Sequence, residues 1–316
     1  MTSRTEQYDV IVIGGGAAGL SGAQALVRSR RSVLVIDDGT PRNAPADGVH
    51  NFLTRDGVPP AEIYALGRQE VQGYGGSFAD GTVTTARRTA DGFEVQLADG
   101  TAYLGRRLLV TTGLVDVLPD VPGLADRWGK DVVHCPYCHG WEVRDQKIGV
   151  LATSPMAMHQ VQLFRQLSDD VTLFLHTAPE PTEEQWEELA ARGIAVVQGK
   201  VEQVEVADDK ITGVRLEGGT VVPRQALAIQ TTVRARAGFL ADLGLEPTML
   251  ESEVGTAIQV DAMGATHIPG VYAAGNVTNP MAQVMPSAAA GLMAGAAINF
   301  DLITEETRQA VAARSS

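Results

Sequence analysis

A strand, a glycine-rich turn, a helix and a second strand follow one another near the start of the chain, and this succession constrains the fold more than any other feature. Residues 8–13 form a run that is apolar apart from Asp9 and is typical of a buried parallel strand. Gly14, Gly16 and Gly19 follow in the spacing GxGxxG, and Asp37 ends the second strand. Such glycines permit a tight turn, a close approach of backbone to a diphosphate and close packing of helix on strand, and the acid suits a ribose hydroxyl. The pattern predicts a dinucleotide-binding βαβ unit; a glycine turn without a ligand is the alternative.

Length and charge limit the function classes. With 316 residues the chain is long enough for two domains. Its formal charge of −13, without any block rich in lysine and arginine, would repel a nucleic-acid backbone. The N-terminal stretch lacks the pattern of a signal peptide, and the longest apolar stretch, residues 287–300, is too short and too rich in small residues to span a bilayer. We expect a soluble, cytoplasmic protein with no nucleic-acid and no membrane partner.

The pattern of strand and helix starts again in the middle of the chain. Apolar runs at 147–152, 171–176 and 195–199 predict strands, and the segments between them have the composition of helices. A proline-containing connector at 118–129 precedes this region and is a plausible hinge. Strands that alternate with helices indicate a second Rossmann-like domain, so we expect an α/β protein with two such three-layer ββα domains.

The segment HCPYCHGWE contains the only two cysteines of the chain, Cys135 and Cys138, with His134 and His139 on either side. A zinc site needs about four ligands, and the remaining histidines are not at zinc-finger spacing, so we expect no metal. Two buried structural cysteines are a further alternative. In a chain of this length from a reducing compartment, a CxxC pair favours redox chemistry, because a turn into a helix and neighbouring imidazoles lower the pKa of a thiol.

Three stretches resemble, in order and spacing, the low-molecular-weight thioredoxin reductase family. They are the N-terminal VIVIGGGAAGLSGAQAL, the CxxC segment, and IPGVYAAGNV followed by a helix that begins near a glutamine. The resemblance implies a homodimer with FAD bound in a discontinuous domain, residues 1–115 plus 238–316. It also implies a second Rossmann-like domain, residues 116–237, that carries the CxxC pair.

The resemblance also implies which residues bind FAD. Gly14, Gly16, Ala17 and Ala18 would hold the diphosphate, and Asp37 the adenosine ribose. The further positions that the resemblance assigns to FAD are Asp38, Arg42, Asn43, His50, Asn51, Val83, Gly113, Gly275, Asn276, Gln283 and Val284. Asn276 stands where the family usually has aspartate; an amide still offers a donor and an acceptor to a hydroxyl.

The second nucleotide-binding turn departs from the family. The family has a glycine motif there, whereas this chain reads LATSPMAMH at residues 151–159, with Pro155 and no glycine. Side chains with a Cβ atom block the approach of a diphosphate to the backbone. After the next strand, His176 is the sole candidate cation for the 2′-phosphate of NADPH, and Glu180 follows it. We expect a domain that is degenerate for NADPH.

The variant CPYCHG, together with a degenerate nicotinamide domain, resembles the dithiol oxidases that close the disulfides of gliotoxin- and holomycin-type natural products. This resemblance implies that Cys138 faces the flavin and that Cys135 meets a small-molecule dithiol. Electrons would then pass to FAD and on to O2, with release of H2O2. His139 is the best candidate for the base that takes the thiol protons, and His134 is second; a packing role for His134 is equally compatible with the sequence.

Two rival functions remain open from the sequence. One is a disulfide reductase of the thioredoxin reductase type, fed by NADPH or by another donor such as ferredoxin. The other is a flavin-binding redox sensor with slow turnover. For the dithiol oxidase we expect a role in the biosynthesis of, or self-protection against, a disulfide-containing natural product.

Overall fold

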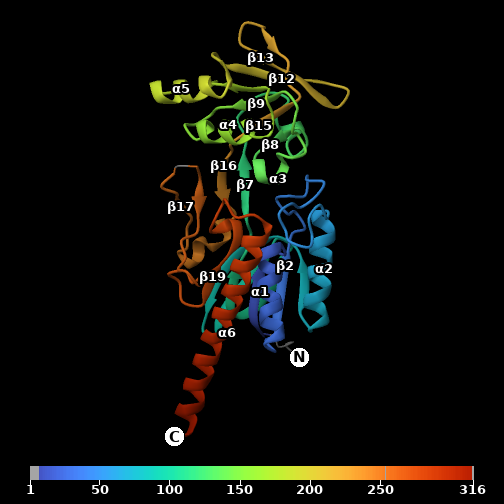
Figure 1. Cartoon of the computed structure of the whole chain (residues 1–316). Helices are drawn as coiled ribbons and strands as arrows, with labels where there is room; N and C mark the ends of the chain where they lie inside the picture. The colour runs from blue at the N-terminus through green and yellow to red at the C-terminus, as the bar shows by residue number, and fades with distance from the viewer. Residues whose placement is uncertain (1–6, 253, 315–316) are drawn as a thin grey trace. The chain divides into compact units, whose positions relative to one another are not determined.

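The computed structural model describes residues 7–252 and 254–314, and the chain divides into two compact units. The first unit comprises Met1–Ala44, Pro59–Val115 and Val233–Ser316, and the second Pro45–Val58 and Asp116–Thr232. Figure 1 shows the elements of both units along the chain. The predicted fold class, α/β with a Rossmann-like domain in each half, is confirmed by the sheets described below.

The first unit is built on a mixed sheet in the order β3-β2-β1-β6-β5-β4, with β19 paired to β6. Strands β1, β2, β3, β6 and β19 run parallel, and β4 and β5 add an antiparallel edge. The strands are β1 (Gln7–Ile13), β2 (Val33–Asp37), β3 (Ser77–Asp80), β4 (Val83–Thr89), β5 (Gly92–Leu97), β6 (Ala102–Val110) and β19 (Val271–Ala273).

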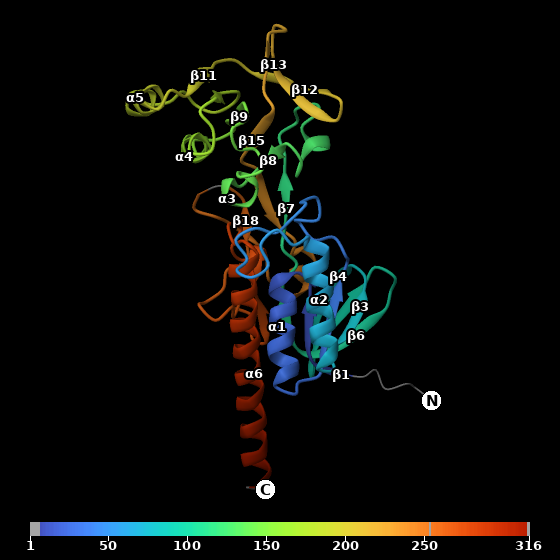
Figure 2. The same ribbon diagram turned by 45° about the vertical axis from the view of Figure 1, so that its right-hand side comes forward.

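Three helices cover one face of this sheet, as Figures 1 and 2 show. They are α1 (Ala17–Arg28), α2 (Pro60–Gly73) and α6 (Val284–Arg314). Successive residues of a strand point to opposite faces, so Val10 and Val12 pack among the helices while Ile11 and Ile13 pack on the other side. Because both faces of Val10–Ile13 are buried, this part of β1 is apolar throughout.

Small residues let α6 lie directly on α1. A Cβ atom added at Gly291 would lie 1.9 Å from the carbonyl oxygen of Ala18, and one added at Gly295 would lie 2.6 Å from that of Gly22. A backbone oxygen cannot move aside as the end of a side chain can. The sequence showed this segment as an apolar stretch rich in small residues. The packing of α6 on α1 requires those small residues.

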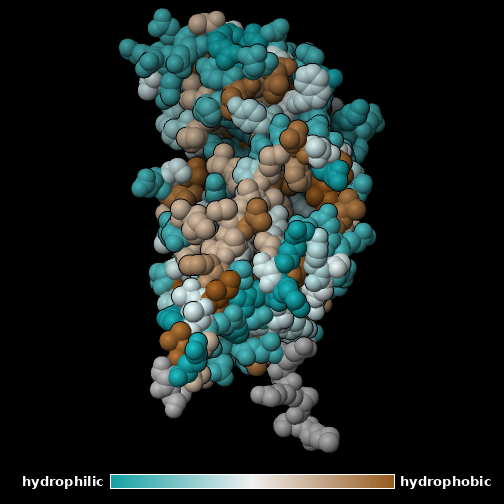
Figure 3. All heavy atoms as spheres, turned by 60° about the horizontal axis from the view of Figure 1, so that its bottom comes forward, coloured by the Kyte–Doolittle hydropathy of each residue, from teal (hydrophilic) through white to brown (hydrophobic). Residues whose placement is uncertain are grey.

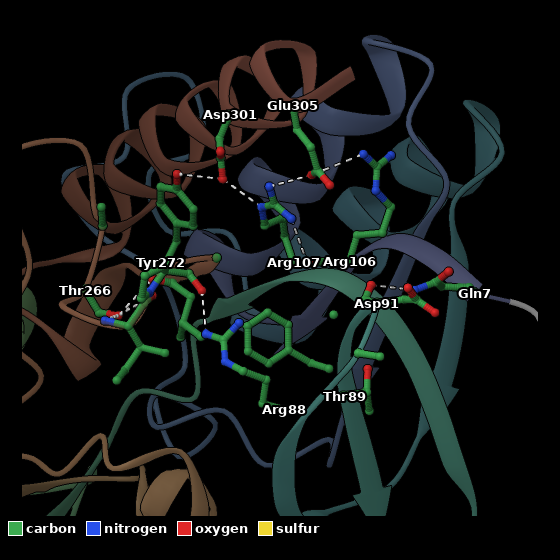
Figure 4. A pocket seen from close by; sticks show the side chains of 18 of the residues that line it. Gln7, Arg88, Thr89, Asp91, Arg106, Arg107, Thr266, Tyr272, Asp301 and Glu305 are labelled. Atoms are coloured by element: carbon green, nitrogen blue, oxygen red, sulfur yellow. Dashed lines mark hydrogen bonds and ion pairs between the residues drawn. The ribbon is translucent and has the colours of Figure 1, made fainter. Parts of the chain in front are cut away.

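Ion pairs connect the C-terminal half of α6 to strand β6 of the sheet. Arg107 lies 2.7 Å from carboxylate oxygens of both Asp301 and Glu305, and Arg106 lies 2.8 Å from Glu306. Figure 4 shows these groups along a cavity of about 910 Å³. Hydrogen bonds from Arg31 and Arg106 lower the pKa of Glu306 to about 2. The pairs are partly exposed, so each contributes roughly 1 kcal/mol or less.

The other face of α6 is exposed and apolar. Figure 3 shows apolar side chains, in tan to brown, gathered along this helix. The larger exposed ones are Met285, Leu292, Met293, Phe300, Ile303 and Val311. Among the described residues α6 is the one helix with the length and composition to cross a membrane, and 33% of its most apolar window is buried in the unit. The core helix of a soluble protein meets the same criterion.

The second unit has a parallel sheet in the order β11-β10-β9-β15-β8. Helices α4 and α5 pack on one face, and a small antiparallel sheet packs on the other (Figure 2). The strands are β8 (Val132–Val133), β9 (Ile148–Leu151), β10 (Val171–Phe174), β11 (Ala195–Val197), β12 (Val201–Ala207), β13 (Lys210–Leu216), β14 (Val221–Val222) and β15 (Ala226–Ile229). The helices are α3 (Pro136–His139), α4 (Ala157–Arg165) and α5 (Glu183–Ala191). The predicted second βαβ pattern is thus present.

Short elements complete the chain. Strands β7 (Leu114–Val117) and β16 (Thr232–Ala235) pair where the chain passes between the units. The others are η1 (Ala125–Arg127), η2 (Gly238–Leu243), β17 (Thr248–Met249), β18 (Thr256–Ala257) and η3 (Gly275–Val277).

The division by contacts differs from the predicted boundaries. The sequence assigned residues 1–115 and 238–316 to one domain, whereas Pro45–Val58 clusters with the second unit and the chain returns to the first at Val233. The physical reason for the first difference is a set of local contacts. Val49 and Val58 form a β-bridge that closes the loop, and Asn51 Nδ2 donates a hydrogen bond to the carbonyl of Tyr137.

The glycine contacts of α6 give a stability prediction. Gly291→Ala places a Cβ atom against the Ala18 carbonyl, so the helices must separate, and we expect a loss of roughly 1–3 kcal/mol in the free energy of unfolding. Thermal and urea unfolding measure this loss. Gly73→Ala is the control, because no atom lies within 4 Å of its Cβ position. Equal stability of Gly291→Ala and the unaltered protein would contradict the packing account.

Candidate active site

The two cysteines lie on a single helical turn of the second unit. Cys135 is the N-cap of α3, and Pro136 occupies the first helical position, where its missing N–H costs nothing. The N–H groups of Cys138 and His139 donate to the carbonyl of Cys135 at 3.2 and 3.1 Å. This turn brings the two Sγ atoms to 2.7 Å from each other. The cysteines can therefore exchange between dithiol and disulfide with little movement of the backbone.

Helix α3 is a single short turn. It spans 4 residues, so its peptide dipoles add little at its N-terminus.

His139 ends α3 in a half-buried position. Its Nε2 atom is buried and has no hydrogen-bond partner among the described residues. Burial lowers the pKa of His139, while the Glu142 and Asp47 carboxylates act in the opposite direction and His50 adds to the lowering. The neutral imidazole is thus the favoured form near pH 7, with a lone pair available to accept a proton.

His134 is oriented by the backbone. Its Nδ1 atom lies 3.0 Å from the carbonyl oxygen of Ile229, and because a carbonyl can only accept, Nδ1 carries the hydrogen. The carbonyl of His134 in turn accepts a 2.8 Å hydrogen bond from Gln160 Nε2. Its ring also lies near Trp128, with 6.4 Å between ring centroids. The ring is therefore held by the carbonyl of Ile229 at the end of β15, and the backbone of His134 is held by Gln160 of α4.

The loop Pro45–Val58 brings further charged groups to the cysteine turn. His50 Nδ1 lies 3.4 Å from Asp56, and His50 Nε2 lies 3.4 Å from Glu142. Asn51 adopts the left-handed region, φ 58°, and fixes the loop to α3 through the carbonyl of Tyr137 at 2.6 Å. His50 and Asn51, both assigned to FAD by resemblance, thus contact the cysteine-bearing turn within the second unit. Sequence reasoning missed Glu142 and Asp56.

The glycine turn of the first unit has the geometry expected at a diphosphate site. Gly14 has φ 109°, and an added Cβ atom there would meet the Thr111 carbonyl oxygen at 2.5 Å. At Gly19 it would meet the Gly14 oxygen at 1.8 Å. Gly16, by contrast, has no atom within 4 Å of its Cβ position, so a ligand can approach the start of α1 there. Ala17 and Ala18 form the first turn of α1.

Asp37 supports that turn directly. Its Oδ1 accepts a 3.0 Å hydrogen bond from the N–H of Gly15, and its backbone carbonyl accepts one from Gly81 at 2.8 Å. The second bond places the turn before β4, and hence Val83, beside the end of β2. Asp38 accepts hydrogen bonds from Thr40.

The remaining predicted cofactor positions lie elsewhere in the first unit. Asn43 Oδ1 accepts a 3.0 Å hydrogen bond from the hydroxyl of Tyr64, and Arg42 is its neighbour in the loop after β2. Gly113 has φ 67° and open space at its Cβ position. Gly275 has φ 82°. A Cβ atom added at Gly275 would lie 2.8 Å from the Cβ atom of Ala18, so this turn adjoins the start of α1.

Asn276 has a structural role that an aspartate could not fill. Its Nδ2 group donates to the carbonyls of Asn279, Pro280 and Ala282 at 3.1, 3.2 and 2.8 Å. A carboxylate has no hydrogen to donate to them. These bonds shape the turn that leads through Gln283 to Val284, the first residue of α6. Asn276, in place of the aspartate usual in the family, thus stabilises the turn before α6.

The second nucleotide turn lacks the features of the first. Residues 152–156 connect β9 to α4 without a glycine. His176, the one cation that the sequence offered for a phosphate, is turned inward, and its Nδ1 accepts a 3.0 Å hydrogen bond from the N–H of Val201. An accepting nitrogen cannot carry a proton, and burial lowers the pKa of His176 with a further contribution from Lys200. His176 is therefore a neutral structural residue.

No metal centre is found in the described ranges 7–252 and 254–314. Within them, no group of at least three histidine, cysteine, aspartate or glutamate side chains is placed to hold a metal ion.

Comparisons with known proteins agree with this architecture. A sequence model described as pyridine nucleotide-disulphide oxidoreductase matches residues 8–295. Thioredoxin reductase tcpT of Claviceps purpurea is 34% identical over 96% of this chain and 97% of its own length. Thioredoxin reductase sirT of Leptosphaeria maculans is 32% identical, with 94% of both chains covered.

Solved structures extend the comparison to the fold. The crystal structure of HlmI superimposes with a TM-score of 0.91 at 44% identity, covering 98% of this chain and 96% of that one. A thioredoxin reductase TrxB from Bacillus anthracis, described as putative, gives a TM-score of 0.87 at 28% identity, covering 95% of this chain and 99% of that one. The fold is that of the thioredoxin reductases, as the sequence predicted.

Proposed function

The chain belongs to the pyridine nucleotide-disulphide oxidoreductase family, and from this premise we propose that it is a dithiol oxidase that converts a small-molecule dithiol to an intramolecular disulfide, with O2 as the electron acceptor. That it is an FAD-dependent oxidoreductase follows from the family. The direction of electron flow is our proposal. Its main support is that the Cys135 and Cys138 sulfurs lie on the same short helix as His139, whose Nε2 atom is buried. The unit that carries them has no glycine in its own nucleotide turn, residues 152–156.

The residues of the first unit fit FAD. The open space at Gly16 at the N-terminus of α1 suits a diphosphate, and Asp37 at the end of β2 suits the ribose. The chemistry that bound FAD supplies is acceptance of an electron pair and its transfer to O2, which becomes H2O2. The other steps are carried by side chains of the second unit.

The thiol chemistry balances as two exchanges. A substrate thiolate attacks Sγ of Cys135 in the Cys135–Cys138 disulfide, and Cys138 leaves as a thiolate. The second substrate thiolate then attacks the substrate sulfur of this mixed disulfide, so Cys135 leaves and the substrate disulfide closes. Reclosure of the Cys135–Cys138 disulfide would release two protons and the electron pair that FAD accepts and O2 takes up, so one dithiol and one O2 give one disulfide and one H2O2.

His139 is the base that we assign to these exchanges. Each substrate thiol must lose its proton before it attacks, because the thiolate is the nucleophile. The buried Nε2 of His139 is kept neutral by desolvation, as a proton acceptor near pH 7 must be. His134, with Nδ1 held on Ile229, is better suited to shaping the turn.

The rival reductase function requires a hydride donor. An NADPH diphosphate would meet side chains at residues 152–156, and the 2′-phosphate would find His176 occupied by the N–H of Val201. These contacts disfavour NADPH as the donor. A redox sensor would need no base for substrate thiols, so the neutral imidazole of His139 favours an enzyme.

We also infer a homodimer that works in the cytoplasm, and a natural-product dithiol as the substrate. The exposed apolar face of α6 supports the dimer, since Leu292 and Phe300 are 51% and 72% exposed. Apolar patches of this kind on a folded unit commonly mark protein interfaces. A second copy of the chain is the occupant that we propose for this face.

Removal of either sulfur tests the oxidase. In Cys135→Ser and Cys138→Ser we expect dithiol-dependent O2 uptake to fall by at least about a hundredfold, because the mixed disulfide or its resolution is lost. An oxygen electrode with a peroxide assay measures uptake and yield, and the unaltered protein should give one H2O2 per disulfide. Ser154→Ala serves as the control with a full rate. A Cys138→Ser protein that oxidises dithiols at full speed would refute the mechanism.

Charge on the exposed face of α6 tests the dimer. Leu292→Glu combined with Phe300→Glu would bury carboxylates in the interface, and we expect the dimer to dissociate to monomers in sedimentation velocity runs. Ala312→Glu, near the end of the same helix, is the control and should remain dimeric. The inference fails if the double variant sediments as a dimer, or if the unaltered protein is a monomer.

A further inference from the structure

A row of alternating carboxylates and imidazoles adjoins the cysteine turn, and the sequence gave no sign of it. Asp56 and Glu142 lie 3.4 Å from the two nitrogens of His50. Glu142 follows His139 by one turn of chain and acts on it electrostatically. Within the second unit the contacts thus run from Asp56 through His50 to Glu142, three residues after His139 in the chain.

We propose that Glu142 is a positioning residue for His139, held in place by His50 and Asp56, and that its carboxylate stabilises the positive imidazole formed when Nε2 of His139 takes a proton from a thiol. The inference rests on the proposed function, in which His139 is the base. The step itself is a proton transfer from a sulfur to Nε2, so no electrons change hands.

The need for such a partner follows from burial. A buried nitrogen without a hydrogen-bond partner is a ready acceptor, but the cation that results is costly unless a negative charge lies nearby. The charged and titratable groups that act on His139 are Glu142 from the turn after α3, and Asp47 and His50 from the loop. Glu142 has the largest effect among the charged groups and is the one that the loop holds.

The loop geometry explains how Glu142 is fixed. Asp56 accepts a hydrogen bond from the N–H of Asn51 at 2.9 Å while it faces His50. Asn51 then ties the loop to Tyr137, and Val49 pairs with Val58. A base oriented by an imidazole-carboxylate pair is the general arrangement by which enzymes stabilise a transient imidazolium. Here the orienting groups come from a segment remote in sequence.

Two measurements on the flavoprotein test this role. The first is an NMR titration of the imidazole resonances of the 6 histidines, with His139 assigned through its loss in His139→Asn. In Glu142→Gln we expect the pKa of His139 to fall, because the carboxylate that raises it is gone. Asp56→Asn should cause a smaller shift in the same direction, and Glu187→Gln on α5 none.

The second measurement is the pH profile of kcat/KM for dithiol oxidation. With a weaker base in Glu142→Gln, the acid limb should move to lower pH and the plateau should fall by roughly tenfold. Glu142→Asp should restore part of the plateau and part of the original position of the acid limb. A purely structural role for Glu142 would change the amount of folded protein without moving the acid limb.

The outcomes separate the two proposals. If the pKa of His139 is the same in Glu142→Gln and in the unaltered protein, the positioning role is overturned, whatever the activity. If the unaltered protein does not oxidise dithiols, the proposed function fails, while the titration still decides whether Glu142 controls His139. An unchanged far-UV circular dichroism spectrum and flavin content establish that each variant is folded.

Discussion

The close approach of backbone to backbone at the first glycine turn is the contact on which the first unit depends. Gly14 lies against Thr111 and Gly19 against Gly14, so β1, α1 and the end of β6 meet without side chains between them. Thr111 adds hydrogen bonds to the carbonyls of Ile13 and Gly14. Beside this contact, the space around the Cβ position of Gly16 at the start of α1 is empty. Backbone also lies directly against backbone where Gly291 of α6 meets Ala18.

The second unit has the same plan of parallel strands and helices but lacks that contact. Its turn at 152–156 has side chains where the first unit has glycines, and His176 serves as an acceptor for Val201. The unit has instead a different chemistry at the turn of α3, where two sulfurs lie beside His139. A domain of nucleotide-binding type can therefore keep its hydrophobic core, which depends on strands and helices, without glycines in its first turn.

The sequence was sufficient for much of this structure because the signals are local. The apolar run at 8–13, the glycine spacing and the CxxC pair each depend on neighbours in the chain, and each predicted its element correctly. The cluster around His50 could not be predicted, because Glu142 and Asp56 approach it only after a loop closes through Val49 and Val58.

Other features escaped the sequence for physical reasons of the same kind. The assignment of Pro45–Val58 to a domain depends on tertiary contacts, and the inward turn of His176 depends on the position of β12. The length of α3 depends on where its capping bonds end. Asn276 could be recognised as a departure from a family pattern, but its three carbonyl partners could not.

The direction of electron flow is the central claim, and anaerobic reduction of the bound flavin tests it most directly. The account expects a small dithiol to bleach the flavin absorbance promptly, NADPH to leave it unchanged, and readmitted O2 to restore it. Prompt bleaching by NADPH would contradict the account, because a dinucleotide would then bind at a turn, residues 152–156, that has side chains in place of glycines.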